Sequence, residues 1–282
     1  MRRAILAVVI LSSGAARATG HGPVFGLATP TLPKGGVSLD VGAMLQQGGP
    51  AGDLHGYAAM LRPMLGYGLT EDLEISLSAP LPILSSPGQR PGRMMGMMPA
   101  TPDAEALLAW RFARDDTGVG SRVESTALLG LDYPTDARRA GIQTAPGFVA
   151  GVVTGYVSRS VYAWAGALYR RYMTPLGGDH PGDLLFYSAV IGYRPEAFRQ
   201  ELPHADWRFF IEAVGEVTGH DRLAGAAVPN TGGHHLFIGP TVLGLFGAWG
   251  ISGGPQLPLY SRLDGTQPED HLRLVTNFTY WF

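Results

Sequence analysis

Apolar and polar positions alternate along most of this chain. Val37, Leu39 and Val41, for example, are separated by Ser38 and Asp40. Successive side chains of a strand point to opposite faces, so each alternating segment is predicted to be a strand with one apolar face. The predicted strands are 36–47, 56–68, 72–81, 104–113, 121–132, 147–158, 160–172, 183–194, 206–218, 233–246, 248–261 and 270–282.

These strands are long, and their number is even. Strands of soluble sheets have about 5–6 residues, whereas a tilted strand that crosses a bilayer needs about 9–11. No segment has helical periodicity, and the 40 Gly and 22 Pro disfavour long helices. An all-β fold is therefore predicted. Alternation alone does not tell which face is inside, because a soluble barrel carries its apolar face inward and a membrane barrel outward.

The connections between these strands alternate in length. Short connections lie at 69–72, 114–120, 158–160 and 247, with one longer exception at 195–205; long connections lie at 48–55, 82–103, 133–146, 173–182, 219–232 and 262–269. Outer-membrane barrels have short periplasmic turns and longer external loops. This favours a transmembrane antiparallel up-and-down β-barrel of about 12 strands with both termini periplasmic.

The last predicted strand ends in aromatic residues. Phe278, Tyr280 and Phe282 share one face, while Trp281 lies on the other. This pattern resembles the C-terminal assembly signal of outer-membrane barrels. We expect these three side chains to face lipid, with Phe282 at the periplasmic rim, and to be read by the outer-membrane barrel assembly machinery.

The N-terminal segment has the features of a secretory signal. Arg2 and Arg3 precede an apolar run at 4–11, and Ala16-Arg-Ala18 provides a cleavage site. The run is too short for a transmembrane helix, which needs roughly 20 residues. We therefore expect a signal peptide at 1–18, an extension or luminal plug at 19–35, a barrel at 36–282, and a location in the bacterial outer membrane.

Composition excludes two other classes of protein. The chain has no Cys, so it is not a disulfide scaffold. Its net charge of −2 becomes −5 once Arg2, Arg3 and Arg17 leave with the signal, and it has no basic patch. Nucleic acid is therefore not an expected partner.

Several stretches resemble a known family. They are His21-Gly-Pro-Val-Phe-Gly26, Leu32-Pro-Lys-Gly-Gly-Val-Ser-Leu-Asp-Val-Gly42, Ile238-Gly-Pro-Thr-Val242 and Trp249-Gly-Ile-Ser-Gly-Gly-Pro-Gln-Leu-Pro-Leu259. They are similar to outer-membrane transporters associated with the meta-cleavage pathway of phenol degradation. The resemblance implies a barrel and uptake of small, often hydrophobic or aromatic compounds. It implies no catalytic or binding residues.

Charged residues recur on the face opposite the apolar one. An Arg or Lys that faced lipid at mid-bilayer would cost about 2–4 kcal/mol, so these residues should face the lumen. Two interpretations remain open: a salt-bridged, partly plugged interior, or a polar pathway whose Arg and Glu side chains select solutes. The candidates are Asp40, Arg62, Glu74, Glu105, Arg111, Glu124, Arg170, Arg208, Glu212, Glu216 and Arg273.

A methionine cluster offers a second kind of chemistry. Met94, Met95, Met97 and Met98 lie in the long connection 82–103. Thioether sulfur suits Cu(I), and His55, His180 and His220 fall in other connections on the same predicted side. A copper-binding surface is one alternative. Apolar packing at the barrel mouth is the favoured interpretation.

His234 and His235 raise the possibility of an enzyme. Outer-membrane phospholipases use a Ser-His-Asn arrangement, which needs a Ser within hydrogen-bond reach of the His. No local Ser motif supports this, and an interfacial structural role is favoured. We therefore predict a channel for passive uptake of small molecules, neither an enzyme nor a cofactor-binding protein, with lipid and a small solute as partners.

Overall fold

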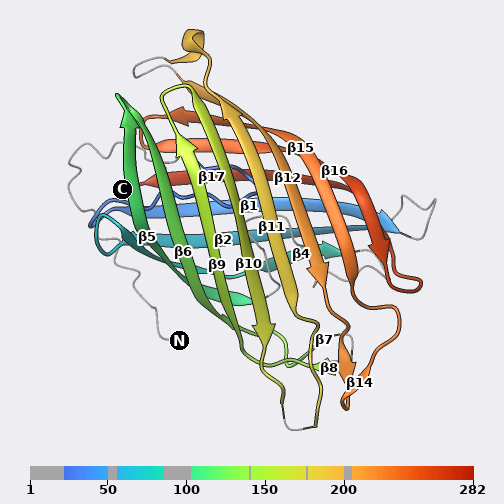
Figure 1. Ribbon diagram of the computed structural model, residues 1–282. Helices are drawn as coiled ribbons and strands as arrows, with labels where there is room; N and C mark the ends of the chain where they lie inside the picture. The colour runs from blue at the N-terminus through green and yellow to red at the C-terminus, as the bar shows by residue number, and fades with distance from the viewer. Residues whose placement is uncertain (1–21, 50–55, 86–102, 140, 176, 200–204) are drawn as a thin grey trace, which may run out of the picture.

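A computed structural model describes residues 22–49, 56–85, 103–139, 141–175, 177–199 and 205–282. Its main feature is one antiparallel sheet that curves around and closes on itself (Figure 1). The strands of this sheet are β1 (Val37–Gly49), β2 (Tyr57–Gly68), β3 (Leu73–Ser78), β4 (Leu81–Ser85), β5 (Ala104–Gly118), β6 (Ser121–Tyr133), β9 (Gly147–Val157), β10 (Val161–Tyr172), β11 (Leu184–Tyr193), β12 (Asp206–Thr218), β15 (Gly233–Phe246), β16 (Trp249–Leu263) and β17 (Glu269–Trp281).

The sheet closes through β1, which pairs with β2 on one side and with β17 on the other. Both β3 and β4 pair with β2 at different heights, so they fill one position in the wall. The wall therefore has 12 positions. The predicted all-β antiparallel barrel is confirmed.

The predicted strand 72–81 is the place where the observed wall differs most. It is interrupted at Ala79 and Pro80, and the wall continues as β4. Proline has no N–H to donate to a neighbouring strand. The Ala79 N–H still donates to the Pro63 carbonyl at 3.2 Å, which keeps the broken strand against β2.

The two ends of the barrel differ. The end with Val37 and Phe282 is here called the terminal rim, and it carries tight turns such as Val119-Gly120. Gly120 has φ 73° and Gly247, in the β15–β16 turn, has φ 67°; two-residue hairpins need this left-handed conformation. The opposite end, the long-loop rim, carries the small hairpins β7–β8 (Arg138–Arg139, Ile142–Gln143) and β13–β14 (Arg222–Leu223, Ala226–Ala227), visible in Figure 1.

Within the described residues, the helical structure is limited to the short 3-10 helix η2 (Glu196–Phe198), in the β11–β12 connection of the terminal rim. Across the described ranges, no helix is long and apolar enough to cross a membrane.

The wall is apolar outside and charged inside. Leu129 is 57% exposed and Ile191 is 68% exposed on the outer face, whereas Arg170 and Glu212 are fully buried inside. A soluble barrel would show the opposite arrangement. The structure thus shows that the apolar face of the strands is the outer one, which the alternation alone did not tell. This exposed apolar belt is suited to lipid.

Candidate functional site

A segment before the first strand lies inside the barrel. Residues 22–35, here called the luminal segment, bury Phe25 and Leu27 to 0% and 2% exposure. These side chains belong to the same apolar cluster as inward-facing Trp164 and Phe210. The Gly35 N–H donates to the Gly68 carbonyl at 2.8 Å, which fixes the segment at the terminal rim. The bore is therefore partly filled by the chain itself.

Glu212 holds the inner end of the luminal segment. Its carboxylate accepts the backbone N–H groups of Val24, Phe25 and Gly26 at 2.8, 2.7 and 2.8 Å. The Thr241 hydroxyl donates to the same carboxylate. Hydrogen bonds to an ionised acceptor are stronger than neutral ones. Four neutral donors therefore compensate one buried charge and anchor the segment at the same time.

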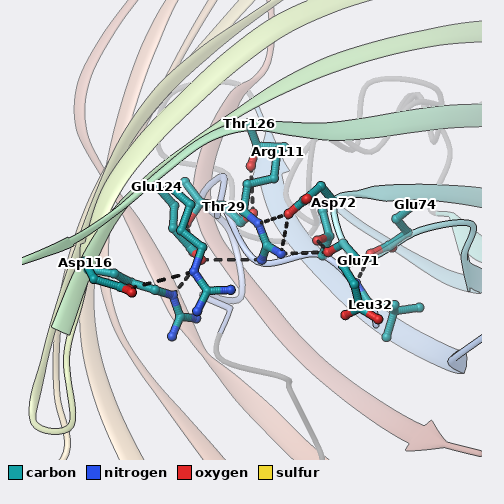
Figure 2. Close-up of polar contacts among 12 residues, drawn as sticks. Thr29, Leu32, Glu71, Asp72, Glu74, Arg111, Asp116, Glu124 and Thr126 are labelled. Carbon is teal, nitrogen blue, oxygen red and sulfur yellow. Dashed lines mark hydrogen bonds and ion pairs between the residues drawn. The ribbon is translucent and has the colours of Figure 1, made fainter. Parts of the chain in front are cut away.

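The middle of the segment contacts a charged network near the terminal rim. Figure 2 shows Arg111 between Asp72 and Glu124, at 2.7 and 3.4 Å. Arg122 pairs with the same Glu124 at 2.6 Å. The Thr29 hydroxyl of the luminal segment donates to Glu124 at 3.1 Å. Arg111 and Glu124 thus join strands β5 and β6 to the segment.

A second network lies toward the long-loop rim. Arg170, which is fully buried, pairs with Glu105 and Asp132 at 2.5 Å each. Arg62 lies 3.6 Å from Glu105 and donates to the Ser78 hydroxyl at 2.7 Å. Two guanidinium groups and two carboxylates therefore compensate one another across β2, β5, β6 and β10.

Two further arginines form ion pairs on the other side of the lumen. Arg273 pairs with Glu216 and Asp270, both at 2.7 Å. Arg208 pairs with Asp206 at 2.9 Å. Both guanidinium groups also lie over aromatic rings, Arg273 over Phe237 at 3.9 Å and Arg208 over Tyr162 at 5.5 Å. These contacts hold the cations in fixed positions.

The structure places all the proposed luminal candidates on the inner face, in two groups. Asp40 and Glu74 are partly exposed to an internal cavity. The remaining candidates are buried: Arg62, Glu105, Arg111, Glu124, Arg170, Arg208, Glu212, Glu216 and Arg273.

Sequence reasoning missed the acidic partners of several of these residues. Asp132 lies on the same strand as Glu124 and inward-facing Gly130, an even number of residues from each. The alternation of side chains therefore could have identified it as an inward-facing residue. Asp72 shares the phase of Glu74 in the predicted strand 72–81, so alternation could have identified it as well, although in the structure it lies in the turn just before β3.

The cavity lies between the luminal segment and the barrel wall and has a volume of about 240 Å³. Most of its wall residues are on β1, β2, β3, β5 and β17, with single residues from β6, β10, β15 and β16. Leu27 and Leu32 of the segment form part of its apolar lining, and Asp40, Glu74 and Ser76 are among its polar side chains. A cavity of about 150 Å³ is enough for benzene. A single-ring molecule therefore fits beside the luminal segment.

His234 and His235 form no catalytic pair with a serine in the described part of the chain. His234 Nε2 lies 2.8 Å from the Tyr187 hydroxyl on the outer face, and His235 stacks on Phe237 at 5.4 Å between ring centroids. Within the described part of the chain, no Ser hydroxyl is hydrogen-bonded to either imidazole. The hydrolase alternative is therefore not favoured.

The copper alternative depends on residues that the structure does not describe. Met94, Met95, Met97 and Met98 lie outside the described residues, as does His55. His180 and His220 instead contact Asp183 and Asp264, at 3.6 and 3.5 Å. Across the described ranges, no three or more His, Cys, Asp or Glu side chains form a group that could hold a metal ion.

Asp179 joins three loops at the long-loop rim. Its two carboxylate oxygens accept the Gln143 and Ala224 N–H groups, each at 2.9 Å. His180 and Arg222 exchange backbone hydrogen bonds at 2.9 and 2.7 Å beside it. The two N–H donors lower the pKa of Asp179 below its ordinary value. This rim is therefore organised by polar contacts between loops.

The aromatic residues of β17 and its end lie where alternation predicts. Phe278, Tyr280 and Phe282 are on the outer face, 45%, 38% and 60% exposed, and Trp281 is buried inside. The Phe282 N–H donates to the Val37 carbonyl at 3.0 Å. The end of β17 is thereby paired with the beginning of β1.

Comparison with known proteins supports the fold. Neither a protein-family model nor a curated protein matches the chain. The crystal structure of an outer membrane channel from Pseudomonas putida F1 is 14% identical with a TM-score of 0.59, and the match covers 90% of this chain and 98% of that one. The barrel is thus similar to a solved outer-membrane channel, as the sequence resemblance implied.

Two other solved structures are more distant. LpxR from Salmonella typhimurium is 12% identical with a TM-score of 0.42, covering 87% of this chain and 100% of that one. The CymD monoaromatic hydrocarbon channel is 12% identical with a TM-score of 0.32, covering 88% of each chain. At these scores neither bears on the fold or the function.

Proposed function

We propose that this protein is an outer-membrane channel for passive uptake of small molecules. The observation that carries the proposal is the inverted wall, apolar outside and charged inside, around a bore that retains a cavity beside the luminal segment. The fold likeness to the P. putida outer membrane channel supports it. The cavity volume of about 240 Å³ favours solutes of single-ring size, including hydrophobic and aromatic ones.

Solute flux tests this proposal. The mature protein is reconstituted into liposomes, and osmotic swelling is followed with neutral solutes of increasing size. Swelling should be rapid for solutes of one ring or smaller and should fall steeply for larger ones, because the luminal segment narrows the bore. Swelling no faster than that of empty liposomes would contradict channel function.

We further propose that the terminal rim faces the periplasm, after export with residues 1–18 as signal and insertion by the barrel assembly machinery. Short turns at that rim and interlocked loops at the other support this orientation. The chain has no Cys, so single cysteines report position cleanly. In intact cells a membrane-impermeant maleimide should label Leu223→Cys and spare Val119→Cys. The reverse pattern would overturn the orientation.

A further inference from the structure

The internal cavity has a chemical character that points to a class of solute. Its lining includes the carboxylates of Asp40 and Glu74 together with Leu27, Leu32 and Trp281. Acidic oxygens and an extensive apolar surface therefore face the same cavity. This combination suits a molecule with a positive group at one end and an apolar group at the other.

The two carboxylates lie on neighbouring parts of the wall. Gly66, on the strand between them, has no side chain, and a Cβ there would meet the Ser38 hydroxyl at 2.6 Å and a Glu74 oxygen at 3.3 Å. The Ser38 hydroxyl donates to Asp40 at 3.2 Å. The missing side chain of Gly66 thus brings Asp40, Ser38 and Glu74 together at one end of the cavity.

The partners of these carboxylates are neutral. Asp40 accepts hydrogen bonds from the Ser38 and Thr279 hydroxyls, and Glu74 accepts the Leu32 N–H at 2.8 Å. Among the described residues, no basic side chain forms an ion pair with either one. Partly buried carboxylates without a counterion favour a cation, because an uncompensated charge away from water is costly.

The other charges around the cavity are already compensated. Glu105 and Arg62 also line it, but Glu105 pairs with Arg62 at 3.6 Å and with Arg170 at 2.5 Å. The negative character therefore lies at the Asp40 and Glu74 end. Among the described residues that line the cavity, the basic side chain is Arg62, which lies beside Glu105, so the lining favours a cationic solute over an anionic one.

Ser76 is an independent sign that the cavity is made for a ligand. Its side chain lines the cavity and the residue is only 9% exposed, yet within the described part of the chain its hydroxyl has no hydrogen-bond partner. The small exposed part of this residue faces the cavity, so the hydroxyl is open to a molecule bound there. The Ser76 hydroxyl is therefore available to a ligand in the same cavity as the two carboxylates.

We infer that this cavity binds a small organic cation, a protonated amine with one ring or a short apolar chain. This inference rests on the proposed function and names a solute class for it. The ammonium group lies between Asp40 and Glu74 with Ser76 beside it, and the apolar part packs on Leu27 and Leu32. A hard divalent cation fits less well, because it needs six or more oxygen ligands and the lining is mainly apolar.

Calorimetric titration of the full mature chain in detergent micelles tests the inference. Benzylammonium is the probe, benzyl alcohol is its uncharged match, and potassium chloride is the inorganic competitor. Benzylammonium should bind about tenfold or more tightly than benzyl alcohol, and equimolar potassium should not displace it. Equal binding of the alcohol, or displacement by potassium, would overturn the inference.

Charge-removing variants locate the site. Asp40→Asn and Glu74→Gln should each weaken benzylammonium binding about tenfold. Asp116→Asn, at the exposed end of β5 near the terminal rim, should leave it unchanged. Heat-modifiable gel migration verifies that each variant is folded. Unchanged affinity in folded Asp40→Asn and Glu74→Gln would overturn the site.

A protein that passes solutes but does not bind benzylammonium would refute this inference and leave the channel proposal intact.

Discussion

At the scale of single residues, Glu212 has the most completely defined contacts in the lumen. It is fully buried, and its partners in the described structure are three backbone N–H groups and the Thr241 hydroxyl. Each hydrogen bond to a charged acceptor contributes about 1.5–3 kcal/mol. The carboxylate of Glu212 therefore holds the luminal segment in place, although the two lie far apart in the sequence.

Replacing this carboxylate should loosen the luminal segment. Glu212→Gln puts an N–H donor where backbone N–H groups already point, and should weaken the attachment by about 2–5 kcal/mol. Single-channel recordings should then show a larger and more variable conductance than the wild type. Glu269→Gln, an exposed carboxylate at the start of β17, is the matched control. An unchanged conductance in a folded Glu212→Gln barrel would count against anchoring by this residue.

Asp179 predicts a pH dependence at the long-loop rim. Its pKa is lowered by the Gln143 and Ala224 N–H groups, so its stabilising effect is present above the unfolded pKa of about 3.9. The effect is lost as pH falls through the lower, folded pKa. The amide NMR shifts of these two residues should therefore titrate with a midpoint below about 3.9. A midpoint at or above that value, or the same titration in Asp179→Asn, would contradict the assignment.

At the scale of elements, close approach between strands depends on glycine. A Cβ on Gly239 of β15 would lie 1.9 Å from the backbone oxygen of Pro255 on β16, so the two strands leave no room for one. Since backbone cannot move aside as a side-chain tip can, any substitution here must separate the strands.

Gly239→Ala should therefore destabilise the barrel by about 1–3 kcal/mol, the usual cost of overpacking. Gly219→Ala is the control, because its nearest neighbouring atom would be 3.6 Å away. The temperature at which heat-modifiable migration is lost should fall for Gly239→Ala only. An equal temperature for both variants would mean that β15 and β16 separate at no cost.

Elements that are determined by neighbouring residues could be predicted from the sequence, whereas those that depend on contacts between distant residues could not. Strands 206–218 and 233–246 were predicted with their observed bounds, because alternation and flanking turn residues act over neighbouring positions. The break at Pro80 was missed, because the same proline is tolerated at the end of a strand. Residues 19–35 were considered only as a possible plug, since the contacts of Val24 with Glu212 join positions 188 residues apart.

At the scale of the whole molecule, the proposed function requires that this inverted barrel is a narrow channel. The wall is closed, its exterior is suited to lipid, and its interior is polar and partly filled by the luminal segment. Sequence alternation predicted the wall and its charged residues. It could not predict which ion pairs form, because those depend on strands brought together by closure.

Single-channel recording of the mature protein in planar lipid bilayers tests this claim most directly. The wild type should show discrete steps of small conductance, because residues 22–35 leave only part of the bore open. Folded protein that inserts, shown by heat-modifiable migration, yet gives no conductance steps would contradict the claim.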